Sequence, residues 1–118
     1  MKERDLTVLQ KILKEILALE DIVRNIETFE EFESTEIHKR ASVMTLLNIG
    51  ELVHHLSLDF KRTHENIPFH AITGLRNVAA HGYLTLNFKL IWSTICESIP
   101  ELKENLLAIP PLDNALPL

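Results

Sequence analysis

The sequence has little cysteine, little glycine and no long apolar run, and each shortage excludes a class of protein. The single Cys96 cannot form a disulfide within the chain, so nothing in the sequence requires an oxidising compartment. Three glycines and scarce alternation of β-branched residues argue against a sheet-rich fold. No apolar run reaches the roughly 18 residues of a transmembrane helix, and the charged start MKERDLTVLQ does not resemble a signal peptide. We therefore expect a cytoplasmic protein without a membrane segment.

Basic residues are not in excess either. The net charge is −5 at pH 7, which argues against a broad lysine- and arginine-rich surface for nucleic acid. The acidic residues concentrate in the first third, because residues 1–36 hold ten acids and five bases and residues 37–118 hold seven of each. Within segment 27–36 the five glutamates are typical of a solvated helix end or loop, with an interaction patch as the alternative. Any nucleic-acid site must therefore be a local pocket.

Apolar residues at helical spacing predict an all-α domain. A chain of 118 residues has room for one core. Apolar side chains recur every three or four residues in four segments, which indicates amphipathic helices. We expect these helices at about 4–29, from a Ser34 or Thr35 cap to near Asp59, from Pro68 to Gly82, and at about 86–99, where Pro100 starts a further turn or a kink. The predicted architecture is an up-and-down bundle of four to five helices.

Three further features of the sequence lead to structural expectations. Residues 1–109 form the helical domain, and the proline-rich end 110–118 is expected to lie as an apolar tail on the surface or on a partner. Glycine in mid-helix lowers helix stability by about 1 kcal/mol relative to alanine. Because Gly50 is present despite this cost, we expect another backbone to pass close to it, where a side chain would not fit. Cys96 lies in an apolar helical stretch and is expected to pack inside the protein.

The six histidines do not predict a metal site. His64 and His70 in HENIPFH are six apart with Pro68 between them, whereas the zinc-protease helix needs a spacing of four. His54 and His55 are adjacent, so on a helix they point about 100° apart and do not readily share an ion. The chain has neither a glycine-rich phosphate loop nor a Ser-His-Asp pattern. We therefore expect no metal and no cofactor.

One short run, RNVAAHGY at residues 76–83, combines the groups that metal-free RNA cleavage needs. Arg76 can fork onto a phosphate and stabilise its developing negative charge. His81 can take or give a proton near neutral pH, and Tyr83 is the only tyrosine of the chain. Together, the arginine and the histidine suffice for attack of a 2′-hydroxyl on the adjacent phosphorus.

Helical geometry brings these residues together only in part. Residues seven apart lie nearly in line on a helix, so Arg76 and Tyr83 would share a stripe, with His81 about 140° from Arg76. Gly82 would let the chain leave the helix, so that His81 and Tyr83 could both turn back toward Arg76. The alternative interpretation is an ordinary helix C-terminus, where Arg76 and His81 bond the last carbonyls and Tyr83 packs at the edge of the core.

The run resembles the R-x4-H-x-Y signature of the HEPN superfamily, and more closely the R-N-x-x-x-H-x-Y signature of its HepT-like branch. The likeness extends over residues 40–106. Gly50-Glu51 resembles the Gly-Glu pair of that family's second long helix, and Ile67-Pro68-Phe69 resembles its approach to the motif. Trp92 and the segment Ile99-Pro100-Glu101-Leu102 resemble the helix that follows.

The resemblance implies a function and a set of roles. It implies a metal-independent ribonuclease that is the toxin of a bacterial toxin–antitoxin pair, with Arg76 and His81 as catalytic residues. Asn77 becomes a supporting polar group, and Glu51 lines the same cleft from the second helix. Tyr83 becomes the residue that an MntA-like nucleotidyltransferase antitoxin modifies with AMP. The alternative is a non-catalytic helical or nucleotide-binding partner subunit of a minimal nucleotidyltransferase.

The implied partners are therefore RNA, the antitoxin and a second copy of the chain. The family implies a dimer in which two copies of the motif face each other across a cleft. Abundant apolar positions favour a homodimer built around the third and fourth predicted helices, and these positions are Phe69, Ile72, Phe88, Ile91 and Trp92.

Overall fold

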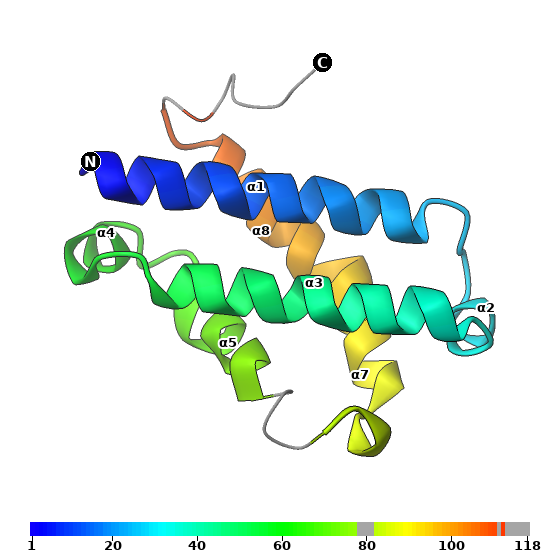
Figure 1. The fold of residues 1–118 in the computed structure, drawn as a ribbon. Helices are drawn as coiled ribbons and strands as arrows, with labels where there is room; N and C mark the ends of the chain where they lie inside the picture. Colours follow the sequence, from blue (N-terminus) through cyan, green and yellow to red (C-terminus); the bar gives the residue numbers. More distant parts are fainter. Residues whose placement is uncertain (78–81, 111, 113–118) are drawn as a thin grey trace.

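Two long antiparallel helices, α1 (Glu3–Val23) and α3 (Glu36–His54), lie side by side and form the frame of the protein (Figure 1). This computed structural model describes residues 1–77, 82–110 and 112. The buried positions of both helices recur every three or four residues, as the apolar spacing predicts. On α1 they include Leu9, Ile12, Leu13, Ile16 and Leu19, and on α3 Leu46, Ile49 and Val53.

The shorter elements surround this pair. α2 (Phe29–Glu33) joins the long helices at one end, and α4 (Leu58–Thr63) follows α3 at the other (Figure 1). Next come α5 (Phe69–Thr73) and the 3-10 turn η1 (Gly74–Arg76), which both contact α3. The chain ends with the 3-10 turn η2 (Tyr83–Thr85), α7 (Phe88–Ser93), the π-helical turn η3 (Thr94–Ser98) and α8 (Ile99–Leu107), which packs on α1. All of these elements are helical, so the all-α prediction is confirmed.

The acidic segment is more structured than the sequence indicates. The first helix ends at Val23 and not near Phe29, and the separate helix α2 follows it. The Thr28 hydroxyl caps α2 by accepting a hydrogen bond from the Glu31 amide at 3.1 Å. Phe32 is fully buried and stacks on Trp92 with ring centroids 5.0 Å apart. One buried aromatic side chain therefore anchors a segment whose glutamates otherwise face solvent.

The second long helix also ends earlier than expected, at His54 and not near Asp59. Ser57 starts α4, because its hydroxyl accepts a hydrogen bond from the Phe60 amide at 3.1 Å. Asp5 of α1 is 1% exposed and accepts from both the Ser57 amide at 2.8 Å and the Ser57 hydroxyl at 2.6 Å. This buried carboxylate holds the turn before α4 against α1.

The last helices form one rod with a π turn inside it (Figure 1). Pro100 lies in the first turn of α8 and does not end the helix, which continues to Leu107. The π turn η3 directly precedes Pro100, where the hydrogen-bond pattern changes and a missing N–H is tolerated. Ile95 and Ile99 are buried on this rod, whereas Cys96 is exposed, so the expectation that Cys96 packs inside is wrong.

Leu112, near the start of the predicted apolar tail, is fully buried, so this part of the tail packs into the core and does not lie on the surface. In the part of the chain that the structure describes, no helix combines the length and the apolar character needed to cross a bilayer.

Candidate active site

The turn η1, which carries Arg76, rests directly on α3 at Gly50. A Cβ atom added to Gly50 would lie 3.1 Å from the Cβ of Leu75, 3.2 Å from the backbone nitrogen of Arg76 and 3.2 Å from the carbonyl oxygen of Ile72. The expectation that another backbone passes close to Gly50 is confirmed. The missing side chain therefore sets the Arg76 backbone beside the turn of α3 that carries Glu51.

Arg76 and Glu51 form an ion pair across this contact. The Arg76 Nε donates to Glu51 Oε2 at 2.7 Å, and both side chains are partly exposed. Such exposed pairs contribute only about 0–1 kcal/mol to stability, so the pair orients the guanidinium more than it stabilises the fold. Glu51 uses only the Nε–H, and no other described residue binds the N–H groups of the two terminal nitrogens, which could fork onto a phosphate.

His55 adds a titratable group that the sequence interpretation missed. Its Nε2 lies 3.4 Å from Glu51 Oε1, an ion pair whenever the imidazole is protonated. The sequence does contain a signal for this contact, because Glu51 and His55 are four residues apart on one helix face. Glu51 therefore lies between two basic side chains, Arg76 and His55.

An open hollow of about 430 Å³, hereafter the Arg76 hollow, contains this pair. It is lined by Leu47, Asn48, Glu51, Arg76 and Asn77. Three of the residues singled out in the sequence, Glu51, Arg76 and Asn77, thus come together. His81 lies outside the described residues.

Tyr83 contacts a different part of α3. The Arg40 guanidinium lies 4.4 Å from the centre of the Tyr83 ring, and the Phe88 ring meets it edge-on at 5.3 Å. Arg40 and Glu51 are eleven residues apart on α3, or about 16 Å along the helix axis. The stripe that a continuous helix would give Arg76 and Tyr83 does not form, because the chain leaves the helical path at Gly82, where φ is 76°. Tyr83 packs instead at the edge of the core, as the alternative interpretation predicted.

The Tyr83 hydroxyl is buried beside the Glu36 carboxylate. It forms no hydrogen bond of good geometry with any described residue, yet it is close enough to Glu36 to lower the pKa of that carboxyl. Burial raises the pKa of the Tyr83 phenol, the Glu36 carboxylate raises it further, and the Arg40 charge opposes the rise. Ionisation of the Tyr83 phenol is therefore disfavoured, and its oxygen is covered in this conformation.

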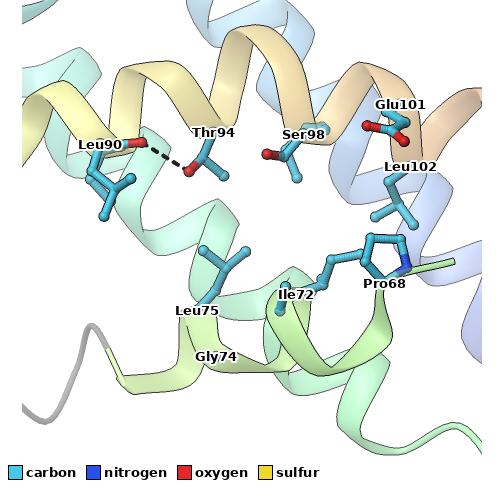
Figure 2. Close-up of a pocket in the computed structure, with 12 residues that line it drawn as sticks. Pro68, Ile72, Gly74, Leu75, Leu90, Thr94, Ser98, Glu101 and Leu102 are labelled. Atoms are coloured by element: carbon cyan, nitrogen blue, oxygen red, sulfur yellow. Dashed lines mark hydrogen bonds between the residues drawn. The ribbon is translucent and has the colours of Figure 1, made fainter.

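A separate apolar cavity of about 410 Å³ lies between α5–η1 and the α7–η3–α8 rod (Figure 2). Ile72 and Leu75 face Leu90 and Leu102 across it, and the Thr94 hydroxyl on its wall already donates to the Leu90 carbonyl at 2.9 Å. A space lined this way suits an apolar group and not a phosphate. In the described ranges, no cluster of three or more His, Cys, Asp or Glu side chains has the arrangement to hold a metal ion.

Comparisons with known proteins agree with the motif. The family model described as "Ribonuclease HepT-like" matches residues 12–109. A protein of Caldanaerobacter subterraneus subsp. tengcongensis, provisionally named an RNase, is 37% identical over 86% of this chain and 89% of its own. A protein of Thermococcus cleftensis, named "Probable ribonuclease HepT", is 32% identical over 87% of this chain and 93% of its own. No solved structure matches significantly.

Proposed function

This chain belongs to the HepT-like ribonuclease family, and we propose that it is an endoribonuclease toxin that cleaves RNA without a metal ion. The names of its relatives support the ribonuclease activity. The observation that carries the proposal is the Arg76 hollow, where Glu51 binds one edge of the guanidinium and leaves the other toward solvent. Asn77 on the same wall offers a further polar contact.

The proposed reaction is transfer of the phosphodiester to the neighbouring 2′-oxygen. His81 accepts the proton of the 2′-hydroxyl while the 2′-oxygen attacks phosphorus, and the bond to the 5′-oxygen breaks. The imidazolium then returns the proton to that leaving oxygen. Arg76 stabilises the extra negative charge on phosphorus through its terminal N–H groups.

The proposed protein is a homodimer, with a different surface from the one that the sequence favours. Phe69, Ile72 and Ile91 are buried in the core and are not free to form an interface. On α3, however, Ile37 is 81% exposed and Met44 is 59% exposed. Both lie on the helix that carries Glu51, so a second copy on this face would lie next to the Arg76 hollow. Light scattering of a Met44→Asp variant tests this, since the variant should be monomeric where the parent is dimeric.

We propose a nucleotidyltransferase antitoxin as the third partner, acting on Tyr83 in the cytoplasm. The Tyr83 oxygen would attack the α-phosphorus of ATP, pyrophosphate would leave, and the enzyme's base would take the phenolic proton. Because the hydroxyl is buried against Glu36, η2 has to leave α3 before this reaction. Co-expression with the neighbouring gene, followed by peptide mass mapping, should show AMP on the Tyr83 peptide and none on Tyr83→Phe.

Cleavage of RNA in EDTA by the purified protein tests the proposed activity. His81→Ala and Arg76→Ala should each lower the cleavage rate by about 10²–10⁴, the usual effect of losing one catalytic acid–base group or charge stabiliser. His70→Ala and Arg62→Ala are matched controls, because both residues are exposed and lie away from the hollow. A rate that falls with EDTA, or one that survives His81→Ala, would show that the chemistry is different. A folded, dimeric protein without cleavage would instead favour the non-catalytic partner subunit.

A further inference from the structure

Most cations of this acidic chain are already engaged by other groups, but a few are not. Lysines and arginines such as Lys39, Arg40, Arg76 and Lys103 have ion pairs. The cations without a hydrogen bond, ion pair or ring contact among the described residues are Arg4, Lys11, Lys14 and Arg62. Cations without an acidic partner among the described residues are available to contact an anionic ligand.

Two of these free cations line one hollow between α1 and α3. This space of about 490 Å³, hereafter the lysine hollow, is lined by Lys11, Lys14, Glu15, Ala18, Asn48, Glu51 and Leu52. Lys11 and Lys14 are three residues apart on α1, so their side chains are neighbours on the helix surface, and both are exposed. The hollow thus holds two adjacent ammonium groups without an acidic partner in the described chain.

The lysine hollow adjoins the Arg76 hollow, because Asn48 and Glu51 line both. The two hollows together are hereafter the groove, with Arg76 and Asn77 on one side of these shared residues and Lys11 and Lys14 on the other. A ligand with several negative charges in a row could contact all three cations at once.

The acidic groups of the groove do not outnumber its cations, because Lys11, Lys14 and Arg76 carry three positive charges while Glu15 and Glu51 carry two negative ones. Glu15 accepts a hydrogen bond from the Asn48 side-chain nitrogen at 2.7 Å, and Glu51 is paired with Arg76 at 2.7 Å. Each carboxylate is therefore held by its own partner on α3 or η1. The groove therefore carries a small net positive charge, and Lys11 and Lys14 are its cations without an acidic partner among the described residues.

We propose that Lys11 and Lys14 bind backbone phosphates of single-stranded RNA next to the phosphate that Arg76 holds. This inference rests on the proposed ribonuclease activity and extends it to the path of the substrate. Grooves for single-stranded nucleic acid follow the backbone with such cations and tolerate any sequence. The contribution is small, since three cations predict a slope of log affinity against log salt of only about −2, at roughly −0.7 per contact. A short groove of this kind reconciles RNA binding with a net charge of −5.

Fluorescence anisotropy with a labelled oligouridylate tests the proposal, in a His81→Ala background that prevents cleavage during titration. Across a series of KCl concentrations, Lys11→Gln and Lys14→Gln should each reduce the salt slope by about 0.7, and the double variant by about 1.4. Arg62→Gln is the matched control, because Arg62 is equally exposed and without a described partner but lines neither hollow. Its slope should stay at the parent value, and Lys11→Arg should retain the contact.

The outcomes separate this inference from the proposed function. Equal slopes for Lys11→Gln, Lys14→Gln and Arg62→Gln would show that the lysines act only through net charge, and would overturn the inference while the ribonuclease stands. A parent that neither binds nor cleaves RNA would overturn both. Each variant should unfold thermally at the same temperature as the parent, so that a changed salt slope reflects lost phosphate contacts and not a loss of folded protein.

Discussion

Gly50 should matter more for the placement of Arg76 than for the stability of the fold. Replacing it with alanine puts a Cβ at 3.1–3.2 Å from two backbone atoms of α5 and η1 and from the Leu75 Cβ. These atoms cannot rotate away as the end of a flexible side chain can. The turn η1 must therefore shift by a few tenths of an ångström, and Arg76 shifts with it.

Two terms of opposite sign decide the free energy of unfolding of Gly50→Ala. Alanine in mid-helix gains about 1 kcal/mol over glycine. The close contacts with the backbone of α5 and η1 cost a similar amount, because η1 has to shift to relieve them. We expect a net change within about 1 kcal/mol for alanine and a loss of about 1–3 kcal/mol for Gly50→Leu, which overfills the contact.

RNA cleavage should fall further than stability, because catalysis is sensitive to small displacements. A misplacement of about 1 Å can cost 10²-fold in rate, so a few tenths of an ångström should cost Gly50→Ala about tenfold. Urea unfolding gives the stability, single-turnover cleavage gives the rate, and the ¹⁵Nε resonance of Arg76 reports its pairing with Glu51.

Gly74→Ala is the matched control, because a Cβ at Gly74 meets nothing within 4 Å and its φ of −58° suits any residue. It should leave the rate and the Arg76 resonance unchanged. Should Gly50→Ala cleave at the parent rate with an unshifted Arg76 resonance, or should Gly74→Ala be equally slow, the positioning role of Gly50 would be refuted.

Two further predictions concern buried polar groups. Asp5→Ala should lower the free energy of unfolding by about 2–4 kcal/mol in urea titrations, because the amide and hydroxyl of Ser57 lose their buried acceptor. Asp59→Ala, which removes only an exposed ion pair, should cost less than about 1 kcal/mol. Absorbance titration of the single tyrosine should give Tyr83 a pKa above the ordinary 10.0, and Glu36→Gln should lower it. The raised pKa means that the folded state favours the protonated phenol. The free energy of unfolding should therefore fall as the pH rises from the pKa of Tyr83 in the unfolded chain through its pKa in the folded protein. An ordinary pKa of Tyr83 in both the parent and Glu36→Gln would contradict the buried placement of its hydroxyl.

The long helices were predictable because each buries one face. The apolar spacing of α1 and α3 is regular over five turns, and no competing pattern interrupts it. α2 was not predictable, since its single buried residue, Phe32, lies among glutamates that are typical of a loop. The end of α3 also depends on a contact between residues 52 positions apart, Asp5 and Ser57, which no local pattern contains.

The candidate site, too, was predictable from the sequence only in part. Gly50 predicted a close backbone on the second long helix, but only the family resemblance placed Glu51 in the same cleft as Arg76, and the ion pair between them was not predicted. The family match over residues 12–109 also includes most of the first helix, where the motif gave no guidance. Tyr83 could not be placed from the sequence, because Gly82 lets the chain leave the helix and the neighbours of Tyr83, Arg40 and Glu36, come from a distant part of the chain.

The helix α3 gives these pieces a common physical frame. Its first turns hold Tyr83 through Glu36 and Arg40, its exposed middle carries Met44, and its last turns carry Asn48 and Glu51 at the junction of the two hollows. A 19-residue helix packed along α1 moves as one body, so the distance between its two ends is fixed. A phosphate on the Tyr83 oxygen would lie beside the Glu36 carboxylate, and like charges repel. Under the proposed function, modification of Tyr83 would therefore weaken the packing of η2 on the first turns of α3.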